Sequence, residues 1–285
     1  SGSGSTDAEA IQQLTVEDST TLAFDANFNE ESAMSFGFGK TQEAIYPIRI
    51  GRRVNAVTRT FSQEIVGDSA YVTVTSTFTG TLIIAASRDS VAPGDTTVTV
   101  DTLISKPFTS QIIRKLILAK VRNTPIPRNN WKIVAVSLPA GGTSTTNVAI
   151  TKATITLQSG ETVVITNPNE FFFSRNHGGG MMRDLPYLNR NSRVTLTVEI
   201  TSNYNDEDFV MLTYGANFRG LFRVKRRLEL VSSTPITGGF SRVYSGEFWS
   251  GNLPGHFHAV VDLTPRGVLF DDAAPVESKV WGLPY

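Results

Sequence analysis

The sequence predicts an all-β protein, built of two antiparallel β-sandwich domains of the jelly-roll or immunoglobulin-like kind behind an N-terminal extension. In segment 193–200 apolar residues alternate strictly with polar ones, as in a strand with one buried and one solvated face. Segment 208–214 is apolar on both sides, as in a central strand. Similar short segments recur between turn residues, which is typical of sandwiches rather than of βαβ units.

Composition sets limits on the kind of protein. The 285 residues suffice for one large or two ordinary domains, and 40% of them are hydrophobic, enough for a sizeable core. Lys plus Arg and Asp plus Glu number 26 each, so the formal charge is zero and we expect no sequence-specific nucleic-acid partner. The absence of Cys excludes disulfides, thiolate metal sites and Cys nucleophiles. No apolar run is long enough to predict a transmembrane helix.

Residues 1–44 are expected to form an extension or tether. The Ser/Gly start, residues 1–5, is flexible by composition and is either a native beginning or an expression scar. A short helix is expected within 6–18. Segment 21–28 has strand alternation, and such a strand either pairs within its own domain or adds to the edge of a neighbour's sheet.

The first sandwich domain is predicted at residues 45–140. We expect its strands near 54–66, 69–79, 81–86, 96–104 and 131–138, with Gly and Pro residues between them. Segment 110–121 has apolar residues at helical spacing, but its β-branched content favours a strand. The Pro- and Gly-containing segment 139–146 is the predicted domain boundary.

The second sandwich domain is predicted at residues 141–285. We expect its strands at 148–157, 161–166, 169–174, 193–201, 208–216, 219–231, 240–249 and 256–264, with a hairpin turn at 158–161. After Pro265 the sequence predicts an extended tail that needs a surface to lie on.

His256, His258 and Asp262 would share one face of a strand, and His177 could join them from a loop. Two imidazoles two residues apart can reach one divalent metal, with a carboxylate completing the set. Asp262, however, lies about 13 Å beyond His258 at strand rise. The alternative is a pair of histidines at the rim of the core.

The oxygen-rich segment 203–208 is a candidate calcium loop, with Asn203, Asn205, Asp206 and Asp208 as ligands. It lacks the glycine and the distal glutamate of an EF-hand loop, so a solvated hairpin turn is the alternative. We expect no cofactor, and the alternative is a divalent metal at one of these two candidate sites.

No catalytic signature accompanies these candidates. The His177–Gly180 string also occurs near the oxyanion site of some esterases, but no Gly-x-Ser-x-Gly elbow is present. Phosphate-loop and dinucleotide motifs are absent as well. We therefore expect a protein that is not an enzyme.

Two further clusters each have two interpretations. Arg223, Lys225 and Arg227 would share a strand face, either as a basic patch for an anionic partner or as an edge strand protected by charge. Trp131, Trp249 and Trp281 form either a platform for sugar rings or ordinary packing.

The Thr- and Val-rich strands, the absent Cys and stretches such as Thr154–Ile165 resemble two groups of proteins across residues 45–285. One is bacterial surface proteins built of immunoglobulin-like sandwiches, and the other is jelly-roll coat proteins of viruses and phages. The resemblance implies an extracellular location, in a virus particle or a cell envelope.

These observations favour a non-catalytic structural subunit that assembles through its sandwich surfaces and extended termini. Its expected partners are proteins, foremost copies of itself. The alternative function is a carbohydrate- or metal-binding module, possibly within a hydrolase.

Overall fold

The computed structural model describes residues 6–18, 34–35, 45–89, 99–175, 191–216, 224–250 and 258–284. Strands dominate this part of the chain and every pairing in it is antiparallel, which confirms the predicted all-β class. The segment predicted as a strand at 21–28 and the His177–Gly180 string lie outside it.

The described strands form two sheets, one of 11 strands and one of 5. The larger sheet has the order β1 (Met34–Ser35), β2 (Tyr46–Val66), β3 (Ser69–Ser87), β4 (Thr102–Lys120), β6 (Ala140–Gly142), β16 (Lys279–Pro284), β15 (His258–Thr264), β11 (Phe209–Ala216) and β12 (Val224–Arg227). Two more strands, β5 (Trp131–Ser137) and β9 (Phe172–Ser174), branch from β4. The smaller sheet has the order β13 (Glu229–Ile236), β14 (Gly239–Trp249), β10 (Arg193–Ser202), β7 (Val148–Leu157) and β8 (Thr162–Ile165).

Four short helical segments complete the described elements: α1 (Asp7–Val16), η1 (Pro127–Asn129), η2 (Pro168–Glu170) and α3 (Arg266–Phe270). The helix expected within 6–18 is thus confirmed. It begins with a capping box, in which Thr6 Oγ1 accepts from the Glu9 amide and Glu9 Oε2 accepts from the Thr6 amide.

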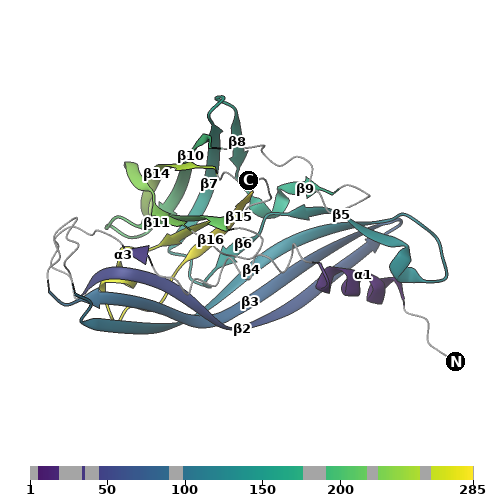
Figure 1. Cartoon of the computed structure of the whole chain (residues 1–285), viewed down its shortest axis with the longest axis horizontal. Coiled ribbons are helices and arrows are strands. Elements are labelled where there is room, and N and C mark those ends of the chain that lie inside the picture. The colour runs from purple at the N-terminus through teal and green to yellow at the C-terminus, as the bar shows by residue number, and fades with distance from the viewer. Residues whose placement is uncertain are drawn as a thin grey trace.

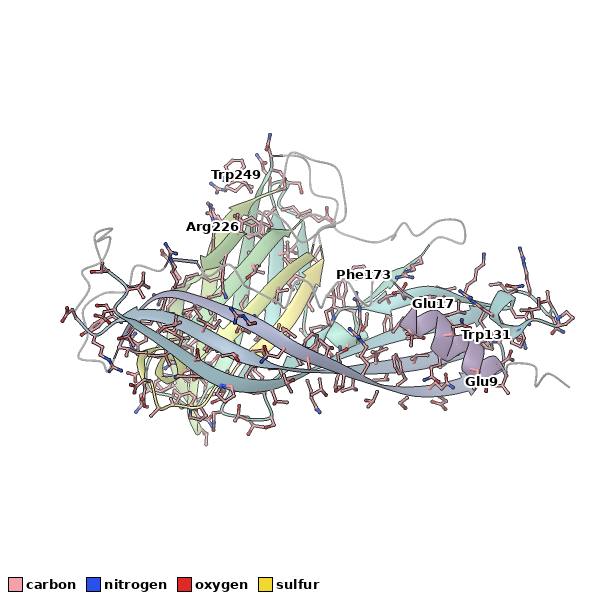
Figure 2. All side chains as sticks on the ribbon, turned by 60° about the horizontal axis from the view of Figure 1, so that its bottom comes forward. Glu9, Glu17, Trp131, Phe173, Arg226 and Trp249 are labelled. Carbon is pink, nitrogen blue, oxygen red and sulfur yellow. The ribbon has the colours of Figure 1, made fainter. Side chains whose placement is uncertain are left out.

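Strands β2, β3 and β4 are 21, 19 and 19 residues long and form a twisted ribbon that extends well beyond the smaller sheet (Figure 1). We call the half of this ribbon nearer the turn at Gly67 and Asp68 the arm, residues 57–79 and 109–120. Helix α1 packs on the arm through the fully buried Ile11, which joins a cluster containing Val72, Leu116 and Trp131. Figure 2 shows Trp131 beside α1.

The smaller sheet packs on one face of β11, β15 and β16, and this is the one sandwich in the described structure. Its core takes in the alternating apolar side chains of β10, as the sequence predicted. A second core lies on the opposite face of the larger sheet under α3, where Val268, Leu269 and Phe270 are buried.

The structure does not confirm a division into two sandwich domains. The predicted boundary, 139–146, contains β6, which pairs with β4 on one side and β16 on the other. The core under α3 likewise combines Phe78 and Ile112 with Met211 and Val280, residues from both predicted domains.

The part of the chain predicted as an extended tail after Pro265 contains α3 and, at residues 279–284, a strand. These residues form β16, an interior strand between β6 and β15, and Val280 is completely buried. Its neighbours are residues 258–263, the preceding strand of the chain, and residues 140–142, far away in sequence.

Two local boundaries also differ. The predicted strands 69–79 and 81–86 are one strand, because Gly80 does not interrupt it. A Cβ at Gly80 would lie 2.2 Å from the Arg53 carbonyl oxygen and 2.9 Å from the Phe108 ring, so the position requires glycine for close approach. Segment 110–121 is a strand through residue 120, as its β-branched content favoured.

Candidate functional site

The predicted histidine-centred metal site is only partly described. His256 and His177 lie outside the described residues, and His258 starts β15 opposite Ala216 and Pro284. Asp262 is placed clearly: its Oδ2 lies 2.6 Å from Arg52 Nη1, with both side chains only 5% exposed. Its Oδ1 accepts a hydrogen bond from Thr264. The Asp262 charge is therefore balanced by a guanidinium, and the metal site itself stays a prediction.

The predicted calcium loop is occupied by the guanidinium group of an arginine of the same chain. Arg242, from β14, donates from Nη1 to Asp208 Oδ2 at 2.5 Å and from Nη2 to the carbonyls of Tyr204 and Asn205 at 2.8 Å each. Both charged side chains are buried. The guanidinium thus binds the carboxylate of one proposed calcium ligand, Asp208, and the backbone carbonyl of another, Asn205, while Asn203 and Asp206 are exposed.

The environment of Asp208 is strongly polar but dry. Ser202 donates to Asp208 Oδ1 at 3.1 Å, and the Asp208 amide donates to the Tyr244 hydroxyl. Burial raises the pKa of Asp208 to about 6, because desolvation outweighs the opposing effects of Ser202 and Arg242. Within the described residues, no three His, Cys, Asp or Glu side chains are grouped so that they could hold a metal ion.

The basic segment forms an edge rather than a uniform patch. β12 is the last strand of the larger sheet, and Lys225 within it is buried. Arg227 donates to Glu207 and lies over the Phe209 ring at 4.3 Å. Of the three cations of the predicted patch, Lys225 is therefore buried and Arg227 is paired with a carboxylate. The third, Arg223, lies outside the described residues.

The three tryptophans are dispersed and form no common platform. Trp131 is buried in the cluster between α1 and the arm and Trp281 in the sandwich, while Trp249 is 56% exposed. Figure 2 shows Trp249 at the tip of the sandwich, far from Trp131 beside α1.

Most strand edges in the described structure carry protection against pairing with another chain. β8, β9 and β12 have only four, three and four residues, and β12 is also basic. β13 contains Pro235 and a bulge between Leu230 and Ser232. The free side of β4 near its start carries Lys106 and Pro107.

The outer edge of β2 in the arm has none of these features, and its only described cover is α1, where Gln63 Nε2 donates to the Ala8 carbonyl at 3.3 Å and Phe61 packs beside the cluster around Ile11. From Thr60 to Val66 it pairs with β3 in unbroken register, and no described strand lies on its other side. Its sequence, TFSQEIV, contains no Pro, no Lys and no bulge, and Ile65 and Val66 are 41% and 56% exposed. The sequence predicted a strand here, but period-2 alternation does not tell an edge strand from a central one.

Comparison of the chain with protein-family models, with curated proteins and with solved structures finds no match in any of the three. None of the helices in the described ranges has the length and apolar character needed to cross a membrane. The candidate functional site therefore rests on the geometry of the chain itself.

Proposed function

We propose that this protein is a non-catalytic structural subunit that assembles by pairing the β2 edge, residues 60–66, with the same edge of a second copy. The observation that carries the proposal is this long edge, which no described strand pairs with and which α1 contacts through Gln63, set beside the short, basic, bulged or Pro-containing edges of the other strands. Following the resemblance noted above, we assign such a subunit to a virus particle or a cell envelope.

An unpaired strand edge presents backbone N–H and C=O groups that bind another strand in the same way as a sheet interior does. Two copies related by a two-fold axis would join these edges antiparallel, so that each uses the same surface. The zero net charge of the chain adds no long-range repulsion between copies.

Charge also selects the register. Pairing centred on Gln63 would place Glu64 opposite Ser62, Ile65 opposite Phe61 and Val66 opposite Thr60. This arrangement keeps the two Glu64 carboxylates from facing each other directly, whereas pairing centred on Glu64 would oppose like charges. It also engages the whole segment from Thr60 to Val66.

Because the chain has no Cys, one introduced thiol reports on this contact alone. We expect Gln63→Cys to form a disulfide-linked dimer under mild oxidation, since directly opposed strand residues lie within disulfide reach. The matched control is Thr234→Cys, on the exposed edge strand β13. Equal cross-linking of the two variants, or a wild type that sediments as a monomer at every concentration, would overturn the proposal.

A charge variant tests the register without oxidation. Gln63→Lys would place two ammonium groups opposite each other, and we expect the dimer dissociation constant to rise at least tenfold. Thr234→Lys is the control and should leave association unchanged. If residues 21–28 of the same chain occupy the β2 edge, wild type and both variants will all be monomeric, which also contradicts assembly through this edge.

A further inference from the structure

A surface groove of about 570 Å³ lies where the smaller sheet ends above the ribbon. Its floor belongs to β4, β6 and β16, and its walls come from the start of β7 and from η2. The polar residues that line it include Thr109, Gln111, Thr143, Ser144, Asn169 and Lys279. Its volume is in the range of ordinary ligand sites.

The groove floor continues onto the outer face of the ribbon. Strand pairing sets Gln111 beside Thr77 and Thr77 beside Thr58, and it sets Ile113 beside Thr75 and Thr75 beside Thr60. Residues directly opposite each other share one side of a sheet. The groove therefore opens onto a row of hydroxyl groups on β3, whose members are Thr73, Thr75, Thr77, Thr79 and Thr81.

The lining offers free hydrogen-bonding groups. The side chains of Thr109, Gln111 and Ser144 make no hydrogen bond within the described part of the chain. Asn169 uses its amide nitrogen on the carbonyls of Ile113 and Leu138, at 2.7 and 3.0 Å, which leaves its Oδ1 as an acceptor. These groups include both donors and acceptors, which is the pattern that sugar hydroxyls match.

Charge is nearly absent from the groove. Its lining has no carboxylate and one cation, Lys279, whose ammonium group donates to the carbonyls of Thr143 and Thr145. Such a lining gives little attraction to a polyanion or a basic peptide. Ala140, Ile113 and Ile150 add apolar surface beside the polar groups, and Trp281 also lines the groove.

We propose that this groove binds a polysaccharide chain and that the chain continues across the ribbon over Thr77 and Thr75. The two threonines lie one strand spacing, about 4.8 Å, from Gln111 and Ile113. The site is separate from the β2 edge, so either proposal can fail without the other.

Affinity electrophoresis through gels that contain a neutral β-glucan, xylan or polygalacturonate tests this site. We expect retention by the β-glucan or the xylan but not by the anionic polygalacturonate, and at least a tenfold weaker affinity for the Thr109→Ala, Gln111→Ala double variant. The matched control is Thr154→Ala, Thr197→Ala, a facing pair of threonines on the outer side of the smaller sheet. No retention by any polymer, or equal loss in both double variants, would overturn the proposal.

Two further measurements define the ligand. Retention that is unchanged between low and high salt identifies a neutral chain, as we expect, whereas retention lost at high salt contradicts the uncharged site. The Thr75→Ala, Thr77→Ala variant should bind the polymer several-fold more weakly but bind a short oligosaccharide as wild type does. Equal loss for both ligands would contradict the extension of the site over the ribbon.

Discussion

Arg242 shows how a single residue decides the character of a loop. The segment 203–208 has the oxygen-rich composition of a calcium loop, yet its cation is supplied by a strand more than 30 residues later, with the Arg242 and Asp208 side chains 2% and 0% exposed. The Arg242 guanidinium donates hydrogen bonds to Asp208, to two loop carbonyls and to Ser233. Its donors are therefore already used within this loop. Sequence composition therefore indicated the chemistry of the loop but not the source of its positive charge.

Replacing Arg242 by an uncharged residue should lower the free energy of unfolding substantially. Arg242→Met leaves the buried Asp208 carboxylate without its partner, and we expect the free energy of unfolding to fall by about 3–5 kcal/mol. Arg193→Met is the control, since its ion pair with Glu247 is largely exposed, and it should cost less than about 1 kcal/mol. Urea unfolding of the three proteins at pH 7 measures both values, and similar losses would contradict a structural role for Arg242.

The raised pKa of Asp208 predicts a pH dependence of definite sign. Its folded value of about 6 exceeds the ordinary value of 3.8, so between these two pH values the folded state binds more protons than the unfolded state. Stability from this group is therefore highest below about pH 4 and is lost as the pH rises through 6.

Urea unfolding of wild type and Asp208→Asn at pH 4, 5, 6 and 7 isolates this contribution. The stability of wild type relative to the variant should increase on acidification from pH 7 to 4, by on the order of 3 kcal/mol for a shift of this size. A constant difference across this range, or a decrease on acidification, would show that Asp208 does not titrate as described.

At the scale of elements, α1 acts as a cover for the arm. It closes the cluster around Val72 and Trp131, and ion pairs of Asp7 with Lys120 and Glu17 with Arg128 fix its two ends. At this solvent exposure such pairs contribute little individually, so packing of Ile11 must provide most of the docking energy.

Ile11→Ala tests this division of the docking energy. We expect a loss of about 2–5 kcal/mol in the free energy of unfolding, because the substitution leaves a cavity under α1. Gln12→Ala, at an exposed position of the same helix, should change it by less than about 0.5 kcal/mol. Thermal or urea unfolding followed by tryptophan fluorescence gives both values, and an Ile11→Ala variant as stable as wild type would mean that α1 is only loosely docked.

Elements were predictable where local pattern decides them. The alternation in 193–201 and 148–157 identified strands almost to the residue. β4 was ambiguous because Ile112 and Leu116 face one side of it while Ile113 and Ile117 face the other, which imitates helical spacing. β16 was missed because its short, Gly- and Pro-containing sequence has no strand pattern of its own. It becomes a strand by lying between β15, which is near in sequence, and β6, which is more than 100 residues away. The β2 edge and the groove depend on strand order, which local pattern does not contain.

At the scale of the whole molecule, the larger sheet joins the ribbon to the sandwich. β16 pairs with β6, β6 pairs with β4, and the core under α3 draws on β3, β4, β11 and β16 alike. A substitution that destabilises β16 should therefore also destabilise strands within residues 45–140, and not only those within residues 141–285.

Val280→Ala in β16 is a suitable disturbance, because Val280 is fully buried in the core under α3 beside residues of β3 and β4. We expect a loss on the order of 2 kcal/mol, with faster amide hydrogen exchange in β15 and β16 and also in the part of β3 and β4 that contributes Phe78, Leu82 and Ile112. Ala149→Gly, at an exposed position of β7 outside this core, serves as the control and should alter exchange only locally.

Hydrogen-exchange mass spectrometry resolves these regions peptide by peptide. If Val280→Ala accelerates exchange only within residues 141–285, the two predicted domains unfold independently; if it also reaches residues 78–86 and 104–112, the shared sheet makes them one cooperative unit, as the pairing of β4, β6 and β16 requires.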